Sequence, residues 1–315
     1  MKIWAYVACA ISLLGFAAFF ICGLLVWTPL GSKYGQHWRY NGGMGVGRFS
    51  PFPNQSALSY SSSNSGKSHI YTVSWTGNAI RQLTNDARED SDVCVSPTGK
   101  FIVFARQDGD AVHLWRMNPS GAGQKQLTFG KGSQTEPSIS AGGGKIAYVE
   151  SLPASGTYGI GVMLANGTRQ TSLTGGTLAV QDTTPVFDPT GTKIYFSRYQ
   201  FAGANQLNAS GRMEVWAINI TGKAEQRIGF GNHPAISPDG QQLAFFDAPQ
   251  NQTLGLMNTT GTGRTIIRQN MGYGACLKYA PDGRHLLVWA SVNSKAEIAS
   301  IDLTGKNLQK IAMIK

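Results

Sequence analysis

A four-residue turn motif that recurs along the chain is the feature that most restricts how this sequence can fold. The clear copies have proline second and glycine fourth, and they are Ser96-Pro97-Thr98-Gly99, Asp188-Pro189-Thr190-Gly191, Ser237-Pro238-Asp239-Gly240 and Ala280-Pro281-Asp282-Gly283. A degraded copy lies at Ser140-Ala141-Gly142-Gly143, and a weak copy begins at Ser50-Pro51. Proline holds φ near about −65° and glycine accepts positive φ, so each copy predicts the reversal of a β-strand.

Segments of strand length accompany every turn. Apolar and aromatic runs follow the turns at residues 100–105, 145–150, 193–198, 242–247 and 285–290. A second set of runs ends in a glycine turn six times, at Gly77, Gly121, Gly167, Gly222, Gly261 and Gly305. Four short strands in each period of roughly 40–50 residues are typical of a propeller. The sequence therefore predicts an all-β, six-bladed β-propeller of four-stranded antiparallel blades over residues 44–315.

The run from Pro234 to Phe245, Pro-x-x-Ser-Pro-Asp-Gly-x-x-Leu-x-Phe, resembles the WD-like repeat of the TolB-like propeller family. The resemblance covers about residues 44–315 and implies the fold, but such propellers serve many roles. TolB itself carries an α/β domain ahead of its propeller, so the resemblance implies a member of this family other than TolB. Peptidase-associated relatives carry a hydrolase domain with a Gly-x-Ser-x-Gly motif, which we do not expect here.

The N-terminal segment is long and apolar. No charged residue occurs from Ile3 to Leu30, which at about 1.5 Å per residue is enough for a helix to cross a hydrocarbon core of ~30 Å. A cleaved secretory signal or lipid attachment at Cys9 or Cys22 is the alternative, but the run is too long and its cleavage sites are poor. We predict a transmembrane signal-anchor at residues 1–31, a linker at 32–43, and a propeller on the periplasmic side of an inner membrane, held by this single pass.

The net charge of +10 does not indicate nucleic-acid binding, because the basic residues are spread along the chain and no binding module is present. Basic residues do recur near the expected fourth strands, at Arg81, Lys125, Arg169, Arg227, Arg264, Arg268 and Lys310. They could form a positive rim for lipid headgroups or an acidic partner, or they could simply protect exposed strand edges. Both interpretations stay open at this point.

Polar residues recur just before the inner strands, where a propeller has its central channel. Asp92, Glu136, Thr184 and His233 share this position, with Cys276 as a less polar member. Asp92, Glu136 and His233 are weak candidates for a metal site, which would suit a metal-dependent lyase or hydrolase. A wet channel rim needs such residues only for solvation and turn hydrogen bonds, and we favour this interpretation, so we predict no catalytic residue, no metal and no cofactor. Cys94 and Cys276 lie in non-neighbouring blades and are expected to be free, buried thiols.

Two polar loops are the best candidates for contact with a partner. One follows Tyr199 and includes Phe201 and Asn205, and the other includes Arg88 and Glu89. Binding usually resides in long loops on a rigid scaffold. We therefore predict a non-enzymatic scaffold that binds proteins in a membrane-associated complex, with no nucleic acid and no small-molecule ligand. The alternatives are the metal-dependent enzyme and a glycan- or peptidoglycan-binding module that uses exposed aromatic residues.

Overall fold

The computed structural model describes residues 46–63, 67–152, 156–177, 180–200, 213–247, 253–271, 276–292 and 295–313. The chain divides into two units, Met1–Arg39 and Tyr40–Lys315, and all described residues belong to the second. The predicted signal-anchor at 1–31 and the linker at 32–43 lie outside the described residues. Within the described ranges, no helix is long and apolar enough to cross a membrane.

The described part of the second unit consists of strands grouped in six sheets. In chain order the strands are β1 (Val46–Pro51), β2 (Ala57–Ser62), β3 (His69–Ser74), β4 (Ile80–Gln82), β5 (Asp90–Val95), β6 (Ile102–Asp108), β7 (Ala111–Met117), β8 (Lys125–Gln126), β9 (Gln134–Ile139), β10 (Lys145–Leu152), β11 (Thr157–Leu164), β12 (Thr171–Ser172), β13 (Val180–Phe187), β14 (Lys193–Gln200), β15 (Glu214–Asn219), β16 (Gln226–Phe230), β17 (Asn232–Ile236), β18 (Gln242–Asp247), β19 (Thr253–Asn258), β20 (Thr265–Arg268), β21 (Leu277–Tyr279), β22 (His285–Val292), β23 (Lys295–Asp302) and β24 (Leu308–Met313).

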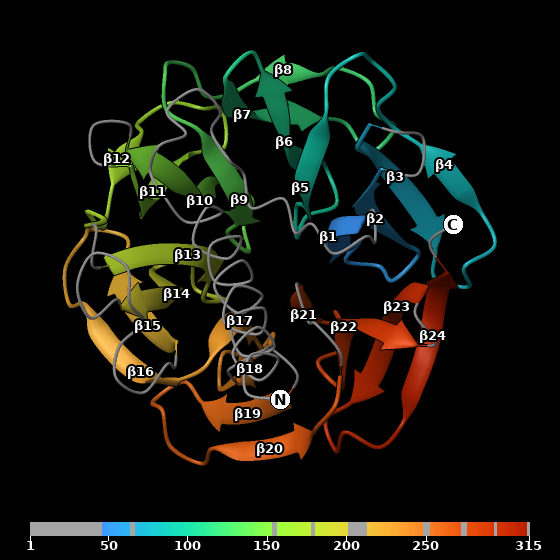
Figure 1. Cartoon of the computed structure of the whole chain (residues 1–315), viewed down its shortest axis with the longest axis vertical. Helices are drawn as coiled ribbons and strands as arrows, with labels where there is room; N and C mark the ends of the chain where they lie inside the picture. The colour runs from blue at the N-terminus through green and yellow to red at the C-terminus, as the bar shows by residue number, and fades with distance from the viewer. Residues whose placement is uncertain are drawn as a thin grey trace, which may run out of the picture. The chain divides into compact units, whose positions relative to one another are not determined.

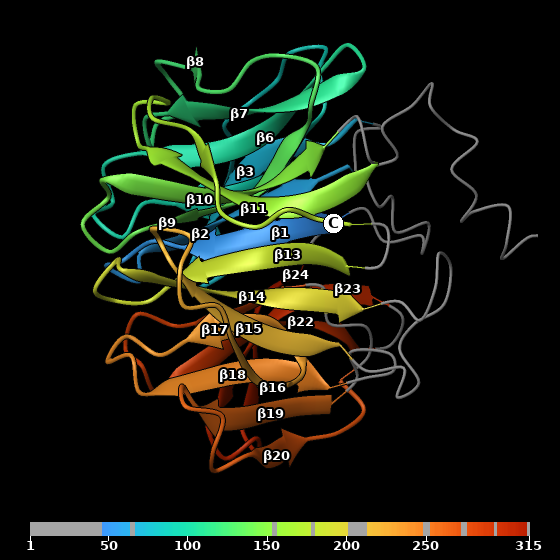
Figure 2. The same ribbon diagram turned by 90° about the vertical axis from the view of Figure 1, so that its left-hand side faces the viewer.

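Each sheet uses four consecutive strands in antiparallel order, from β1-β2-β3-β4 to β21-β22-β23-β24. Figure 1 shows the six sheets as blades around a centre, with the first strand of each blade innermost. Figure 2 shows the blades from the side, with strands running between the two faces of the ring. The predicted all-β, six-bladed propeller of four-stranded antiparallel blades is confirmed.

The recurring turns join the first two strands of their blades. In blade 2 the Gly99 N–H donates to Ser96 O at 2.7 Å, and Gly99 has φ of +68°. The degraded copy closes in the same way without proline, since the Gly143 N–H donates to Ser140 O at 2.8 Å. Glycine at the fourth position is therefore the feature that the turns of blades 2 to 6 share, because it takes the left-handed conformation at little cost.

Blade 1 departs from the predicted turn. The weak copy at Ser50-Pro51 is wrong, because both residues lie inside β1. The turn instead runs from Phe52 to Gln55, whose N–H donates to Phe52 O at 3.0 Å and whose φ is +54°. Gln55 takes the place of glycine, so the sequence pattern is obscured. In the correct alignment Phe52, which opens the turn of blade 1, lies 44 residues before Ser96, which opens the turn of blade 2.

Side chains from neighbouring blades share six hydrophobic clusters. One cluster joins blades 1 and 2 through Ile70 and Phe104, and the last joins blades 6 and 1. In that last cluster the rings of Phe49 and Trp289 meet edge to face, with centroids 6.2 Å apart. Each blade keeps its own four strands among the described residues, so side-chain packing rather than strand exchange closes the ring.

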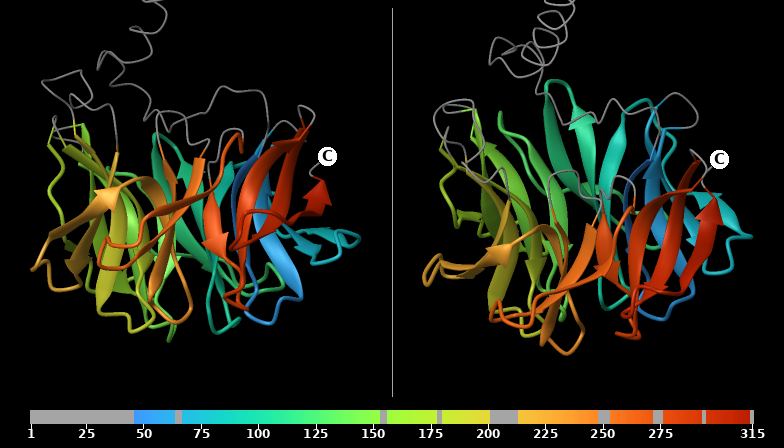
Figure 3. Two further views of the ribbon diagram at one scale, coloured as in Figure 1. Left: turned by 90° about the horizontal axis from the view of Figure 1, so that it is seen from below. Right: turned by 60° about the horizontal axis from the view of Figure 1, so that its bottom comes forward.

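The two faces of the ring carry different connections, as Figure 3 shows. We call one the turn face, because it holds the turns that join first to second and third to fourth strands. We call the other the loop face, where the first strand of every blade begins. The loop face carries residues 85–89, the hairpin between β6 and β7, and residues 129–133.

Candidate functional site at the centre of the ring

The inner strands β1, β5, β9, β13 and β17 each pair irregularly with the next strand. Four of these irregularities contain a non-glycine residue with positive φ: Asp92 (48°), Glu136 (53°), Thr184 (52°) and His233 (48°). An L-residue in this conformation costs roughly 1–2 kcal/mol, so surrounding contacts must hold it. The four polar residues grouped from the sequence therefore occupy the same place in their blades.

Arg48 of β1 completes this set and links two other blades. Its Nη2 lies 2.6 Å from Glu136 Oε1, and its Nε lies 3.4 Å from Asp92 Oδ1. The three side chains are only about one-fifth exposed, at 19%, 20% and 17%. Burial opposes the charged form of Arg48, but the carboxylates of Glu136 and Asp92 outweigh it and raise the pKa of the guanidinium.

Sequence reasoning missed Arg48 because blade 1 was aligned on the wrong turn. With the turn at residues 52–55, Arg48 stands 44 residues before Asp92, and Asp92 stands 44 residues before Glu136. This spacing of 44 residues is the sequence signal that could have identified Arg48 as the equivalent of Asp92 and Glu136. We call Arg48, Asp92, Glu136, Thr184 and His233 the central belt.

Hydrogen bonds continue the central belt from blade to blade. The Glu136 N–H donates to Asp92 Oδ2 at 3.4 Å, and the Thr184 N–H donates to Glu136 Oε2 at 2.6 Å. Ser197 Oγ then accepts the His233 N–H at 2.8 Å and lies 2.5 Å from Thr184 Oγ1. The polar side chains thus satisfy backbone donors that the irregular inner strands turn away from the sheets.

His233 is the neutral member of the central belt. Burial, followed by the positive charges of Arg48 and Lys278, lowers the pKa of its imidazole to about 3. Its ring meets Phe246 edge to face, with centroids 6.2 Å apart, and Nδ1 has no hydrogen-bond partner among the described residues. At neutral pH this side chain therefore adds no charge to the centre.

The three weak metal candidates do not assemble into one donor set. Arg48 places a positive charge between Asp92 and Glu136, which disfavours a cation there. No contact within the described residues joins His233 to either carboxylate. In the same part of the chain, no three His, Cys, Asp or Glu side chains are arranged to hold a metal ion.

The two cysteines of the propeller are free and buried, which confirms the sequence prediction. Cys276 Sγ lies 3.6 Å from Phe49 O at the junction of blades 6 and 1. Burial is the main cause that raises the pKa of the Cys94 thiol. A raised pKa leaves little thiolate on Cys94, so this side chain serves packing.

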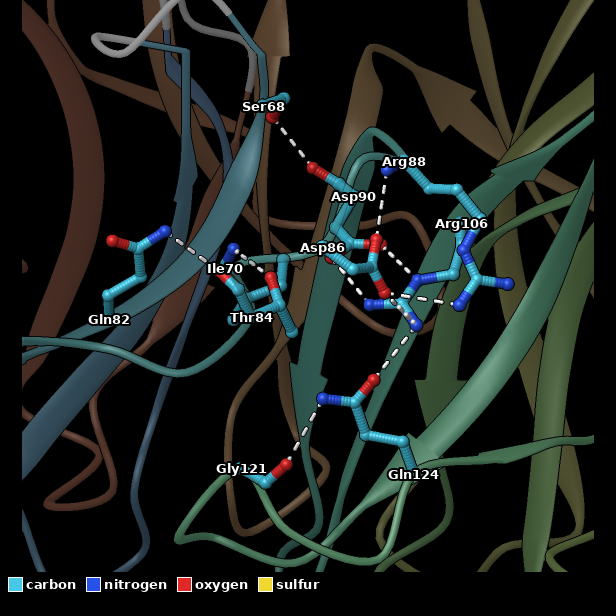
Figure 4. A network of polar contacts seen from close by, with 10 residues as sticks. All are labelled: Ser68, Ile70, Gln82, Thr84, Asp86, Arg88, Asp90, Arg106, Gly121 and Gln124. Atoms are coloured by element: carbon cyan, nitrogen blue, oxygen red, sulfur yellow. Dashed lines mark hydrogen bonds and ion pairs between the residues drawn. The ribbon is translucent and has the colours of Figure 1, made fainter.

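The loop at residues 85–89 is tied to blade 2, as Figure 4 shows. Arg106 is buried and donates two hydrogen bonds to the fully buried Asp90. Its Nε lies 2.5 Å from Asp90 Oδ1, and its Nη2 lies 2.9 Å from Asp90 Oδ2. Its Nη1 lies 2.9 Å from Asp86, which also binds Arg88 at 3.1 Å. The Arg88 guanidinium lies 4.9 Å from the Trp115 ring centre. Arg88 therefore holds this loop in place.

The other predicted contact residues have different surroundings. The backbone carbonyl of Glu89 accepts the Gln107 N–H at 2.8 Å, so Glu89 also helps to anchor the loop. Tyr199 is partly exposed near the end of β14, on the loop face. Phe201 and Asn205 lie outside the described residues. The structure thus places Arg88, Glu89 and Tyr199 on the loop face.

Several solved structures share this fold. TolB from Acinetobacter baumannii matches with a TM-score of 0.66 and 13% identity, over 85% of this chain and 62% of that one. The chain therefore spans less than two thirds of the length of that protein. Putative TolB from Agrobacterium tumefaciens matches with a TM-score of 0.61 and 18% identity, over 76% of this chain and 87% of that one. Oligogalacturonate lyase from Vibrio parahaemolyticus has a TM-score of 0.55 and 10% identity, over 82% and 91%.

These identities are too low to transfer an activity, so the solved structures support the fold alone. A family model provides the stronger assignment, because the TolB beta propeller domain matches residues 35–233. This match covers more than half of the chain and includes the turns, inner strands and central belt of blades 1 to 4. The chain belongs to the TolB beta propeller domain family.

Proposed function

We propose that this protein is a non-enzymatic interaction propeller that is tethered to an inner membrane and displayed on its extracytoplasmic side. In this proposal residues 1–31 form a single-pass anchor, residues 32–43 a linker, and residues 44–315 the propeller. Twelve extended linker residues reach at most ~40 Å, so the propeller stays close to the bilayer. A partner in a membrane-associated complex would be within its reach.

The self-contained centre is the observation that carries this proposal. Arg48 pairs with both Asp92 and Glu136, and the backbone N–H groups of Thr184 and His233 donate to Glu136 and Ser197. Catalysis needs charged groups positioned toward a substrate, whereas these groups are directed toward each other. Recognition is therefore assigned to the outer surfaces of the ring.

The chain path favours the loop face as the contact surface. β1 begins on the loop face, so under this proposal a tether ahead of β1 would enter the propeller from that face. The loop around Arg88 and the end of β14 at Tyr199 lie on the same face. A partner held at the membrane would meet these residues first.

Photo-cross-linking in membranes tests the proposal. A cross-linking amino acid at Ala87 or Tyr199 should capture a discrete protein, whereas the same group at Lys100 or Thr260 on the turn face should not. The full chain should also stay in membranes after an alkaline wash. Release by that wash would overturn the anchor, and capture mainly from the turn face would overturn the assigned surface.

A further inference from the structure

A depression on the loop face of blade 2 brings charged, polar and aromatic side chains together. It has a volume of about 680 Å³, within the range of roughly 300–1,000 Å³ typical of small-ligand sites. The side chains that matter for recognition there are Asp108, Asp110, His113, Gln126, Phe129 and Lys131. None of them belongs to the central belt or to the contact residues predicted from the sequence.

Two short segments form its walls, and both are held firmly. The β6–β7 hairpin pairs Asp108 with Ala111, which leaves only two residues at its tip. The opposite wall follows Thr128, whose Oγ1 accepts the Leu114 N–H at 2.9 Å. Ser133 at the far end accepts the Val112 N–H at 3.0 Å. Residues 129–132 are therefore fixed to β7 at both ends, and the depression is preformed.

Phe129 is exposed without a structural reason. Its side chain is 68% exposed, and Ile80 at 50% is the other large apolar side chain exposed to this extent in the described part of the chain. Burial of a phenylalanine side chain normally stabilises a protein, and this residue forgoes that gain in the isolated protein. An aromatic ring displayed beside a preformed depression is suited to contact a ligand.

The polar groups around Phe129 combine donors and acceptors. His113 is buried, with 4% exposed, and its Nδ1 lies 3.1 Å from Gln134 Oε1, which leaves Nε2 for the depression. Gln126 uses its Nε2 to bond Thr128 O at 2.9 Å, so its Oε1 remains an acceptor. Asp108 and Asp110 add carboxylates, and Lys131 adds an ammonium group.

We propose that this depression binds an uncharged carbohydrate, such as a hexose or N-acetylhexosamine unit of a glycan. Sugar hydroxyls both donate and accept, which matches the mixed polar rim. The C–H face of a pyranose can lie on the negative face of an aromatic ring such as Phe129. Two carboxylates against one ammonium make the rim acidic, which disfavours uronate glycans, while Lys131 disfavours a strongly basic peptide.

Binding of defined oligosaccharides to the full chain in detergent tests this site. Saturation-transfer NMR and calorimetry should detect tri-N-acetylchitotriose or cellotriose, and trigalacturonate should bind more weakly. Phe129→Ala should weaken binding at least about tenfold, and Phe129→Trp should retain it. Asp110→Asn should weaken binding by a smaller factor. Ile80→Ala, which removes the other exposed apolar side chain, should leave the affinity unchanged.

The substitutions are exposed, so each variant should unfold at the same temperature as the parent chain. Equal affinity in Phe129→Ala and the parent would overturn the proposal. So would the absence of binding to all neutral oligosaccharides, or binding of trilysine alone, which would make the site a basic-peptide site. None of these outcomes depends on the membrane tether or on the proposed protein partner.

Discussion

Arg48 in β1 and Glu136 in β9 form an ion pair of 2.6 Å across the inside of the ring, although they belong to blades 1 and 3. Asp92 of blade 2 lies between them in the chain and shares the same guanidinium. One side chain thus ties three consecutive blades together at their innermost strands. This pair also sets one positive charge against two partly buried carboxylates.

Removal of the Arg48 guanidinium should show how far the stability of the propeller depends on these ion pairs. Arg48→Met leaves Asp92 and Glu136 without their counter-charge, so we expect the free energy of unfolding to fall by about 2–3 kcal/mol at pH 7. Denaturant unfolding measures the loss. Arg48→Met combined with Glu136→Gln should recover part of it, and the exposed Arg284→Met should change little. Strict additivity of the two central substitutions would contradict the coupling.

The histidine of the central belt should make the protein less stable in mild acid. Burial, Arg48 and Lys278 lower the pKa of His233 to about 3, from an ordinary value of 6.5. Between pH 6.5 and pH 3 the unfolded chain therefore binds a proton on His233 that the folded protein does not bind. Above pH 6.5 His233 does not change the free energy of unfolding with pH. As the pH falls from 6.5 toward 3, that free energy decreases by up to ~1.4 kcal/mol per pH unit.

Two measurements test the behaviour of His233. Urea unfolding should show a larger loss of stability between pH 7 and pH 5 in the parent chain than in His233→Gln. An NMR titration should show that the His233 ring remains neutral to below pH 5. Equal pH dependence in both proteins, or a ring that titrates near pH 6.5, would show that burial and the charges of Arg48 and Lys278 do not lower the pKa of His233.

The buried pair in blade 2 should be the most sensitive ionic contact. Asp90 is fully buried, so Arg106→Met leaves its carboxylate without its buried counter-charge. We expect the free energy of unfolding to fall by about 3–5 kcal/mol. Arg88→Met, in the same network but 40% exposed, should cost less than about 1 kcal/mol. Thermal or urea unfolding separates the two. A similar loss in both variants would mean that burial of Asp90 is not what sets the cost.

A glycine on the turn face should be irreplaceable for steric reasons. A Cβ at Gly261 would lie 2.1 Å from Ile228 O of the preceding blade, and Gly261 also has φ of +88°. Gly109 has φ of +60° with open space around it, so it isolates the conformational cost. We expect Gly109→Ala to cost about 1 kcal/mol and Gly261→Ala at least about 2 kcal/mol more. Equal losses in unfolding experiments would exclude the interblade clash.

The sequence by itself determined the number of blades, the four strands in each blade and most of the turns. These features depend on local chemistry, because proline, glycine and alternating apolar residues act within a few positions of one another. The same local logic failed in blade 1. Gln55 adopts positive φ where the other copies use glycine, so the pattern there pointed to Ser50-Pro51. That two-residue error also concealed the equivalence of Arg48 with Asp92.

Only the tertiary structure decided what the polar residues do. Asp92, Glu136 and His233 could be grouped from their spacing, but their roles depend on Arg48, which reaches them only once the ring is formed. Arg88 was predicted as a contact residue, and its stacking on Trp115 arises from the fold of blade 2. Phe129 is one aromatic residue among many in the sequence. Its exposure became evident only in the folded protein, because solvent access is a property of packed chains and not of local sequence.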